Sequence, residues 1–131
     1  MITVVAFDPG ISTGMAIYDG TTELTFTLSV AEVTTQEYLK ILSESTPHYS
    51  TAIEFVPIPT PSKMNQTLLT VVSRLWVDFP KAEIFLPGTW KTSSIARLES
   101  SVPKNQHEKD ALHIAMFYYD RLRRERNEEI S

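Results

Sequence analysis

The chain has 131 residues, of which 42% are hydrophobic, and this size and composition predict one globular domain, residues 1–131, around a single core. It contains no cysteine, which excludes disulfides, thiolate zinc sites and cysteine nucleophiles, so any metal must be bound by oxygen or imidazole. No apolar run approaches the ~20 residues of a membrane span, and the first residues read as a strand instead of a signal peptide. We therefore expect a cytoplasmic protein without membrane contacts.

The net charge of −4 speaks against a general nucleic-acid binder, but the charge is unevenly distributed. Residues 1–60 contain one Lys or Arg and seven Asp or Glu, whereas residues 61–131 contain eleven and nine. Only the second part is therefore a candidate for a phosphate-binding surface. The arginines near the C-terminus are read as a solvated helix face.

The first third of the chain predicts three strands. Residues 2–7 form a nearly continuous apolar run, which is typical of a strand buried on both faces. Residues 14–18 end at the turn signal Asp19-Gly20, and residues 24–28 alternate and return antiparallel. Apolar residues then recur at helical spacing, so we expect one helix over residues 34–45, which ends before Pro47.

The remaining elements alternate between strand and helix. Residues 52–55 form a fourth apolar strand, and prolines at 57, 59 and 61 separate it from a helix over residues 62–78. Residues 82–86 are the fifth strand, followed by a short helix that we expect Thr89 to cap. Asn105 and Glu108 resemble a capping box that opens the last helix.

The helix over residues 62–78 carries a second apolar stripe beside its core-facing one. Leu69 and Trp76 lie seven residues apart on this stripe, which faces no obvious core. Two interpretations stay open, namely the edge of the core and a surface for a partner chain.

Three carboxylates stand where elements begin or end. Asp8 ends the first strand before a Pro-Gly turn, Glu54 ends the fourth, and Asp110 follows His107 by one helical turn near the positive end of the last helix. Carboxylates on separate rigid elements are what a divalent-metal site requires, because Mg²⁺ prefers hard oxygen ligands and is shared with substrate phosphates. His113, one turn beyond Asp110, either hydrogen-bonds a ligand or has no role, and the second reading is favoured.

Four segments together resemble the RuvC family of Holliday-junction resolvases. They are Phe7-Asp8-Pro9-Gly10-x-x-x-Gly14, Ala52-Ile53-Glu54-Phe55, Pro87-Gly88-Thr89-Trp90-Lys91 and His107-x-x-Asp110-Ala111, in this order across nearly the whole chain. The resemblance implies a ribonuclease H-like α/β fold, with a central five-stranded mixed sheet flanked by helices. It also implies a homodimer that cleaves four-way DNA junctions by paired symmetric nicks.

The resemblance further implies the roles of individual residues. It makes Asp8, Glu54, His107 and Asp110 the catalytic residues and the ligands of two Mg²⁺ ions, for which Mn²⁺ substitutes. Lys91 would bind a phosphate, and Phe55 with the proline-rich loop after it would engage the junction centre. Lys63 is assigned to DNA binding as well.

Other functions remain open at this point. A ribonuclease H-like nuclease acting on structured RNA or on other branched DNA would use the same carboxylates. An actin-type ATP-binding module shares the Asp-x-Gly motif but duplicates its unit, which 131 residues do not allow. A non-catalytic junction-binding subunit would be expected to have lost a carboxylate. The short chain and the proline-rich loop resemble a phage-encoded branch of the family, and no cleavage preference can be carried over.

Overall fold

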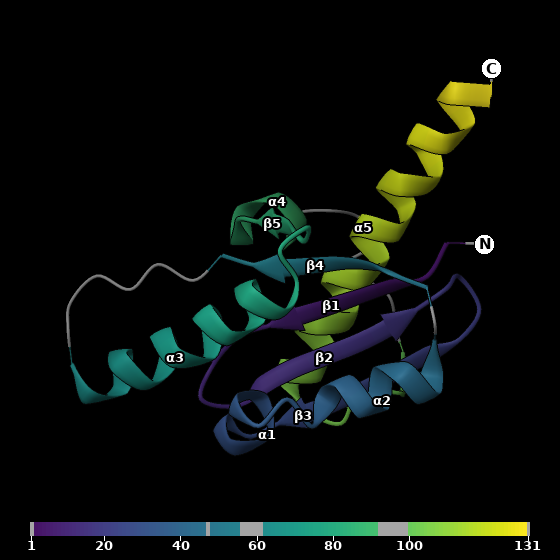
Figure 1. Ribbon diagram of the computed structural model, residues 1–131. Coiled ribbons are helices and arrows are strands. Elements are labelled where there is room, and N and C mark those ends of the chain that lie inside the picture. The colour runs from purple at the N-terminus through teal and green to yellow at the C-terminus, as the bar shows by residue number, and fades with distance from the viewer. Residues whose placement is uncertain (1, 47, 56–61, 92–99, 131) are drawn as a thin grey trace.

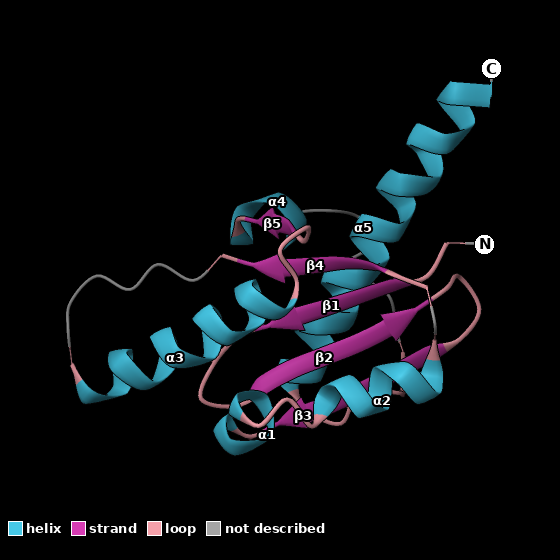
Figure 2. Cartoon of the chain, viewed as in Figure 1, coloured by secondary structure: helices cyan, strands magenta, loops and turns pink. Residues whose placement is uncertain are grey.

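The fold is built on a five-stranded mixed sheet with helices on both faces (Figures 1 and 2). The structure is a computed structural model that describes residues 2–46, 48–55, 62–91 and 100–130. The strands are β1 (Val4–Asp8), β2 (Thr13–Tyr18), β3 (Glu23–Leu28), β4 (Ser50–Glu54) and β5 (Glu83–Phe85). Their order is β3-β2-β1-β4-β5; β1 is antiparallel to β2, β2 is antiparallel to β3, and β4 is parallel to both β1 and β5. The expected mixed sheet is confirmed.

β1 is the central strand and is buried on both faces, as its apolar run predicts. Val5 and Phe7 pack into the core on one face, whereas Val4 and Ala6 pack into the core on the other. Successive side chains of a strand point to opposite faces, so a strand covered on both sides needs apolar residues at every position. Asp8 is where this run ends, and its carboxylate therefore falls at the C-terminal end of the central strand.

Helices cover the two faces unequally. The helices α1 (Val30–Thr34), α2 (Tyr38–Ser45) and α3 (Lys63–Asp78) lie on one face, and the long α5 (Gln106–Ile130) lies on the other with the short α4 (Pro87–Lys91) (Figure 1). Within the described ranges, no helix has both the length and the apolar character to cross a membrane.

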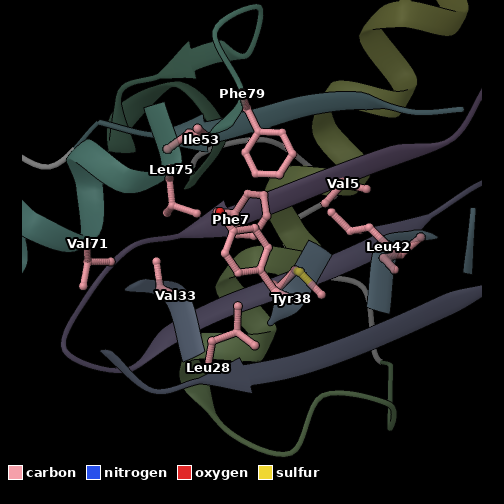
Figure 3. Packing of buried hydrophobic residues seen from close by; sticks show 12 residues of the cluster. Val5, Phe7, Leu28, Val33, Tyr38, Leu42, Ile53, Val71, Leu75 and Phe79 are labelled. Atoms are coloured by element: carbon pink, nitrogen blue, oxygen red, sulfur yellow. The ribbon is translucent and has the colours of Figure 1, made fainter. Parts of the chain in front are cut away.

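The core on the face of α1, α2 and α3 is centred on Phe7. The ring of Phe7 packs against Tyr38 and Phe79, with centroids 5.7 and 5.2 Å apart (Figure 3). On the other face, Ala111 and Ala115 are fully buried, and their small side chains let α5 lie close to the sheet. A close helix there brings its first turns within reach of the strand ends.

The single helix expected over residues 34–45 is wrong, because the structure forms two helices there. α1 begins earlier, since Ser29 and Glu32 form a capping box with hydrogen bonds of 3.1 and 3.0 Å. Gln36 then separates α1 from α2 with a positive φ of 61°. Its left-handed backbone costs about 1–2 kcal/mol, and its side chain offers compensation by donating to Asp78 Oδ1 at 2.6 Å.

The expected caps of the last two helices have opposite outcomes. Thr89 does not cap α4, because that helix already begins at Pro87, a residue preferred in the first helical turn, and the Thr89 amide donates to the Leu86 carbonyl at 3.0 Å. At α5 one half of the expected capping box is present: Asn105 Oδ1 accepts the amide of Glu108 at 2.9 Å. The reciprocal half is absent, because the Glu108 carboxylate accepts from Thr25, Thr27 and the Lys104 amide instead of from the Asn105 amide.

Candidate active site

The three predicted carboxylates come from elements that meet at one edge of the sheet. Asp8 is the last residue of β1 and Glu54 the last of β4. These strands are parallel neighbours, with Phe7 paired to Ile53, so their C-terminal ends lie side by side. Asp110 comes from the beginning of α5, which packs across β1 and β2.

Gly14 allows the start of α5 to approach the sheet. A Cβ atom at this position would lie 1.9 Å from the backbone carbonyl oxygen of His107. Any side chain at Gly14 would therefore displace the first turn of α5, which carries Asp110. The second glycine of the Asp8-Pro-Gly-x-x-x-Gly motif thus has a packing role at the site.

Glu108 anchors the same turn of α5 on β3. It is 3% exposed, its Oε1 accepts from Thr25 Oγ1 at 2.7 Å and from the Lys104 amide at 3.2 Å, and its Oε2 accepts from Thr27 Oγ1 at 2.6 Å. Burial by itself would raise the pKa of Glu108, but these hydrogen bonds outweigh it, and the pKa lies below its usual value. The sequence identified Glu108 only through the capping box with Asn105 and missed this anchor.

Asp110 is also held from within α5. Gln106 Nε2 donates to Asp110 Oδ1 at 2.7 Å, across one helical turn. Residues four apart on a helix lie on the same face, so this spacing was a signal that sequence reasoning had not used.

Burial and mutual repulsion raise the pKa of Asp8 and of Glu54. Burial is the main cause that raises the pKa of Asp8 from 3.8 to about 7, and the charges of Glu54 and Asp110 raise it further. Burial likewise raises the pKa of Glu54, again with a contribution from Asp110. The structure therefore brings Asp8, Glu54 and Asp110 into one electrostatic cluster, and such perturbed carboxyls are typical of functional sites.

Lys91 supplies the opposing charge. Its ammonium group lowers the pKa of both Asp8 and Glu54, against the effect of burial. The side chain is exposed and its Nζ lies 5.3 Å from the centroid of the Trp90 ring. An exposed cation beside three carboxylates is free to contact a phosphate that lies over the cluster.

Glu54 carries the clearest sign of a missing partner. The residue is 8% exposed, and its Oε2 is buried without a hydrogen-bond partner in the described part of the chain. Leaving a buried charged oxygen unsatisfied costs a few kcal/mol. Either a buried hydrogen-bond donor or a divalent cation bound by the clustered carboxylates would remove this cost.

The carboxylates fit a cation by their chemistry and position, but they do not form a complete coordination sphere. Among the described residues, no group of three or more His, Cys, Asp or Glu side chains is placed to hold a metal ion. The donor set is therefore a convergent cluster of hard oxygens, and the side chains would have to close further around an ion.

His107 is the predicted site residue that the structure brings least into the cluster. Its side chain is exposed, and its charge is not among the causes that shift the pKa of Asp8 or Glu54. What packs against the sheet is its backbone carbonyl, at Gly14.

His113 packs against Trp90, which sequence reasoning had given no role. The two rings are edge to face, with centroids 4.7 Å apart. Burial lowers the pKa of His113, while the charge of Asp110 and a hydrogen bond with the Trp90 backbone raise it. His113 therefore lies beside the carboxylate cluster and the α4 helix.

Two of the predicted DNA-contacting residues, Phe55 and Lys63, lie on either side of a segment that is not described. Phe55 is partly buried at the end of β4 and, with Trp76 and Ile84, lines a cavity of about 270 Å³. Lys63 is the first residue of α3, but its side chain and the loop that contains Pro57 lie outside the described residues.

The chain is similar in structure to RuvC from Thermus thermophilus. In a structure of that protein in complex with Holliday junction substrate, the TM-score is 0.69 at 17% identity, over 93% of this chain and 96% of that chain. A second RuvC structure from the same organism gives 0.60 at 17% identity, over 92% and 96%. No protein-family model and no curated protein matches the sequence. At this identity the likeness establishes the fold, which is the ribonuclease H-like fold that the sequence resemblance implied.

Proposed function

We propose that this chain is a metal-dependent endonuclease that resolves four-way DNA junctions by paired symmetric nicks. The observation that carries the proposal is the cluster of Asp8, Glu54 and Asp110, with Lys91 beside it, on the ends of β1, β4 and α5. Likeness over most of the chain to a protein bound to a Holliday junction substrate supports the choice of DNA substrate.

The three carboxylates would hold two Mg²⁺ ions, with Mn²⁺ as a substitute. The chemistry that such ions supply is activation of water for attack on the phosphodiester and neutralisation of charge on the departing oxygen. Within the protein, burial and mutual repulsion raise the pKa of Asp8 and of Glu54. A bound cation would lower both pKa values again and favour the ionised carboxylates. Lys91 would fix the phosphate by a charge-assisted contact.

His107 is proposed as the fourth ligand. It lies one helical turn before Asp110, near the start of α5. Residues three apart on a helix lie on the same face, so the exposed His107 imidazole would have to turn toward Asp110 to act as a ligand.

A homodimer is proposed because one active site makes only one nick. Two nicks related by the two-fold axis of a junction require a second site in a symmetric position, and an isologous dimer supplies it. On α3, Leu69, Trp76 and Val77 are 52%, 41% and 63% exposed. This apolar surface follows the loop after Phe55, so dimerisation through α3 would bring two such loops, with Phe55 and Lys63, toward one junction centre.

The proposal is tested with end-labelled DNA. Four-way junctions, replication forks and linear duplexes are incubated with the protein in Mg²⁺ or in EDTA, and a hairpin RNA is included. We expect symmetric nicks in the four-way junction, in Mg²⁺ only. Preferred cleavage of the RNA or of forks would instead favour the alternative, a ribonuclease H-like nuclease with another substrate.

Three matched variants test the site itself. Asp8→Asn, Glu54→Gln and Asp110→Asn each remove one charged oxygen and keep the side-chain shape, so nicking should be lost while junction binding in a gel-shift assay persists. Retained cleavage in two of the three would rule out the proposed site.

A further inference from the structure

Trp90 is a buried side chain beside the cluster that the proposed mechanism does not use. It is 1% exposed and belongs to the core on the α5 face of the sheet. Its ring stands edge-on to His113 at 4.7 Å, with an angle of 85° between the planes, and lies 5.3 Å from the ammonium group of Lys91. The ring therefore connects Lys91 with the turn of α5 that follows Asp110.

The indole N–H of Trp90 and one carboxylate oxygen of Glu54 are a donor and an acceptor that both lack a partner. Trp90 Nε1 and Glu54 Oε2 are each buried and unsatisfied within the described residues. The two groups come from adjacent elements, because Glu54 pairs with Phe85 of β5 and Phe85 packs in the same core cluster as Trp90. The indole also lowers the pKa of Glu54, although the two atoms do not meet the geometry of a hydrogen bond as placed. A buried polar group without a partner is unfavourable, so a contact between them would remove both penalties.

We propose that Trp90 is the positioning residue of Glu54: its N–H holds one carboxylate oxygen and leaves the other turned toward the site. An indole N–H only donates and an ionised carboxylate only accepts, so the contact fixes the orientation of the charged side chain. Because the Trp90 ring is buried, it stays in place when the Glu54 side chain rotates. Its N–H therefore defines one fixed position for a carboxylate oxygen. The role in nicking rests on the proposed function, whereas the contact itself does not.

The contact is tested by the NMR signals of the indole groups. The chain has two tryptophans, so a ¹⁵N-labelled protein shows two indole N–H signals, which Trp76→Phe assigns. We expect the Trp90 signal to exchange slowly with solvent, to move in Glu54→Gln and to move when Mg²⁺ is added. Trp76, exposed on α3 at the other face, is the internal control and should not move. A Trp90 signal that is unchanged by Glu54→Gln would overturn the proposal.

The positioning role is tested with Trp90→Phe, which keeps an aromatic ring and removes the N–H. Groups that orient metal ligands typically contribute 10–100-fold to metal affinity or activity. We expect Mn²⁺ affinity, measured on the DNA-free protein, to fall by about ten-fold, and kcat to fall similarly with KM for the junction unchanged. In a Glu54→Gln background the same substitution should have no further effect on Mn²⁺ affinity, since Trp90 acts through Glu54.

The outcomes separate this inference from the proposed function. A Trp90 signal that responds to Glu54→Gln in a protein that cuts no junction supports the positioning role and refutes the nuclease. An active nuclease in which Trp90→Phe keeps full Mn²⁺ affinity and kcat refutes the positioning role alone. If Trp90→Phe does not fold, the NMR result on intact Trp90 decides the question.

Discussion

Asp8→Asn should stabilise the metal-free protein while it abolishes nicking. Burial, together with the charges of Glu54 and Asp110, raises the pKa of Asp8 from 3.8 to about 7. Each pH unit corresponds to about 1.4 kcal/mol, so ionised Asp8 destabilises the folded chain by about 4 kcal/mol at pH 8. Asparagine keeps the shape and removes this charge. The expected gain corresponds to a rise in Tm of about 15 °C.

The raised pKa of Asp8 determines the pH range in which the stability of the wild type changes. Between about pH 4 and pH 7 the folded state binds a proton at Asp8 that the unfolded state has already lost. The stability of the wild type therefore falls as pH rises through this window and levels off above it. Asp8→Asn removes this contribution, so the two proteins should differ little near pH 4 and most above pH 7.

Urea unfolding in EDTA at pH 4, 6 and 8 measures these differences. Asp19→Asn is the matched control, because hydrogen bonds from the amides of Thr22 and Thr21 lower the pKa of Asp19, and its loss should not stabilise the protein. Added Mg²⁺ should raise the stability of the wild type at pH 8 and leave Asp8→Asn nearly unchanged, since a ligand stabilises only the state that binds it. An Asp8→Asn variant that is less stable than the wild type at pH 8 would refute the reasoning.

Three further changes have defined outcomes. Lys91→Ala should weaken junction binding and reduce the log–log salt slope by about one, because one phosphate contact is lost; an unchanged slope with unchanged activity would leave Lys91 without a role in DNA binding. Glu108→Gln should lower the free energy of unfolding by about 2 kcal/mol at pH 7, since it weakens a buried network. Because the pKa of Glu108 lies below its ordinary value of 4.5, this difference should shrink in urea titrations as pH falls below that value and the folded-state carboxylate becomes protonated. Leu69→Asp combined with Trp76→Asp should turn a dimer into monomers in sedimentation, and a wild type that is monomeric yet resolves junctions would exclude the α3 interface.

The local pattern of the sequence was enough to place most elements. The unbroken apolar run before Asp8 identified a strand buried on both faces, and the ends of two strands located Asp8 and Glu54 correctly. Local pattern failed where capping decided the outcome. Ser29 and Glu32 start α1 before the expected helix, and Pro87 starts α4 where Thr89 had been expected to act as cap.

The sequence by itself determined that β1 is buried on both faces and where the carboxylates stand along the chain, because hydrophobic periodicity and turn residues act over a few neighbouring positions. Only the tertiary structure decided which groups meet. The approach of α5 to Gly14, the bonds of Glu108 to β3 and the position of Trp90 beside Glu54 join residues that are distant in sequence. Such contacts depend on how two packed surfaces fit together, and no spacing along one strand or helix encodes that fit.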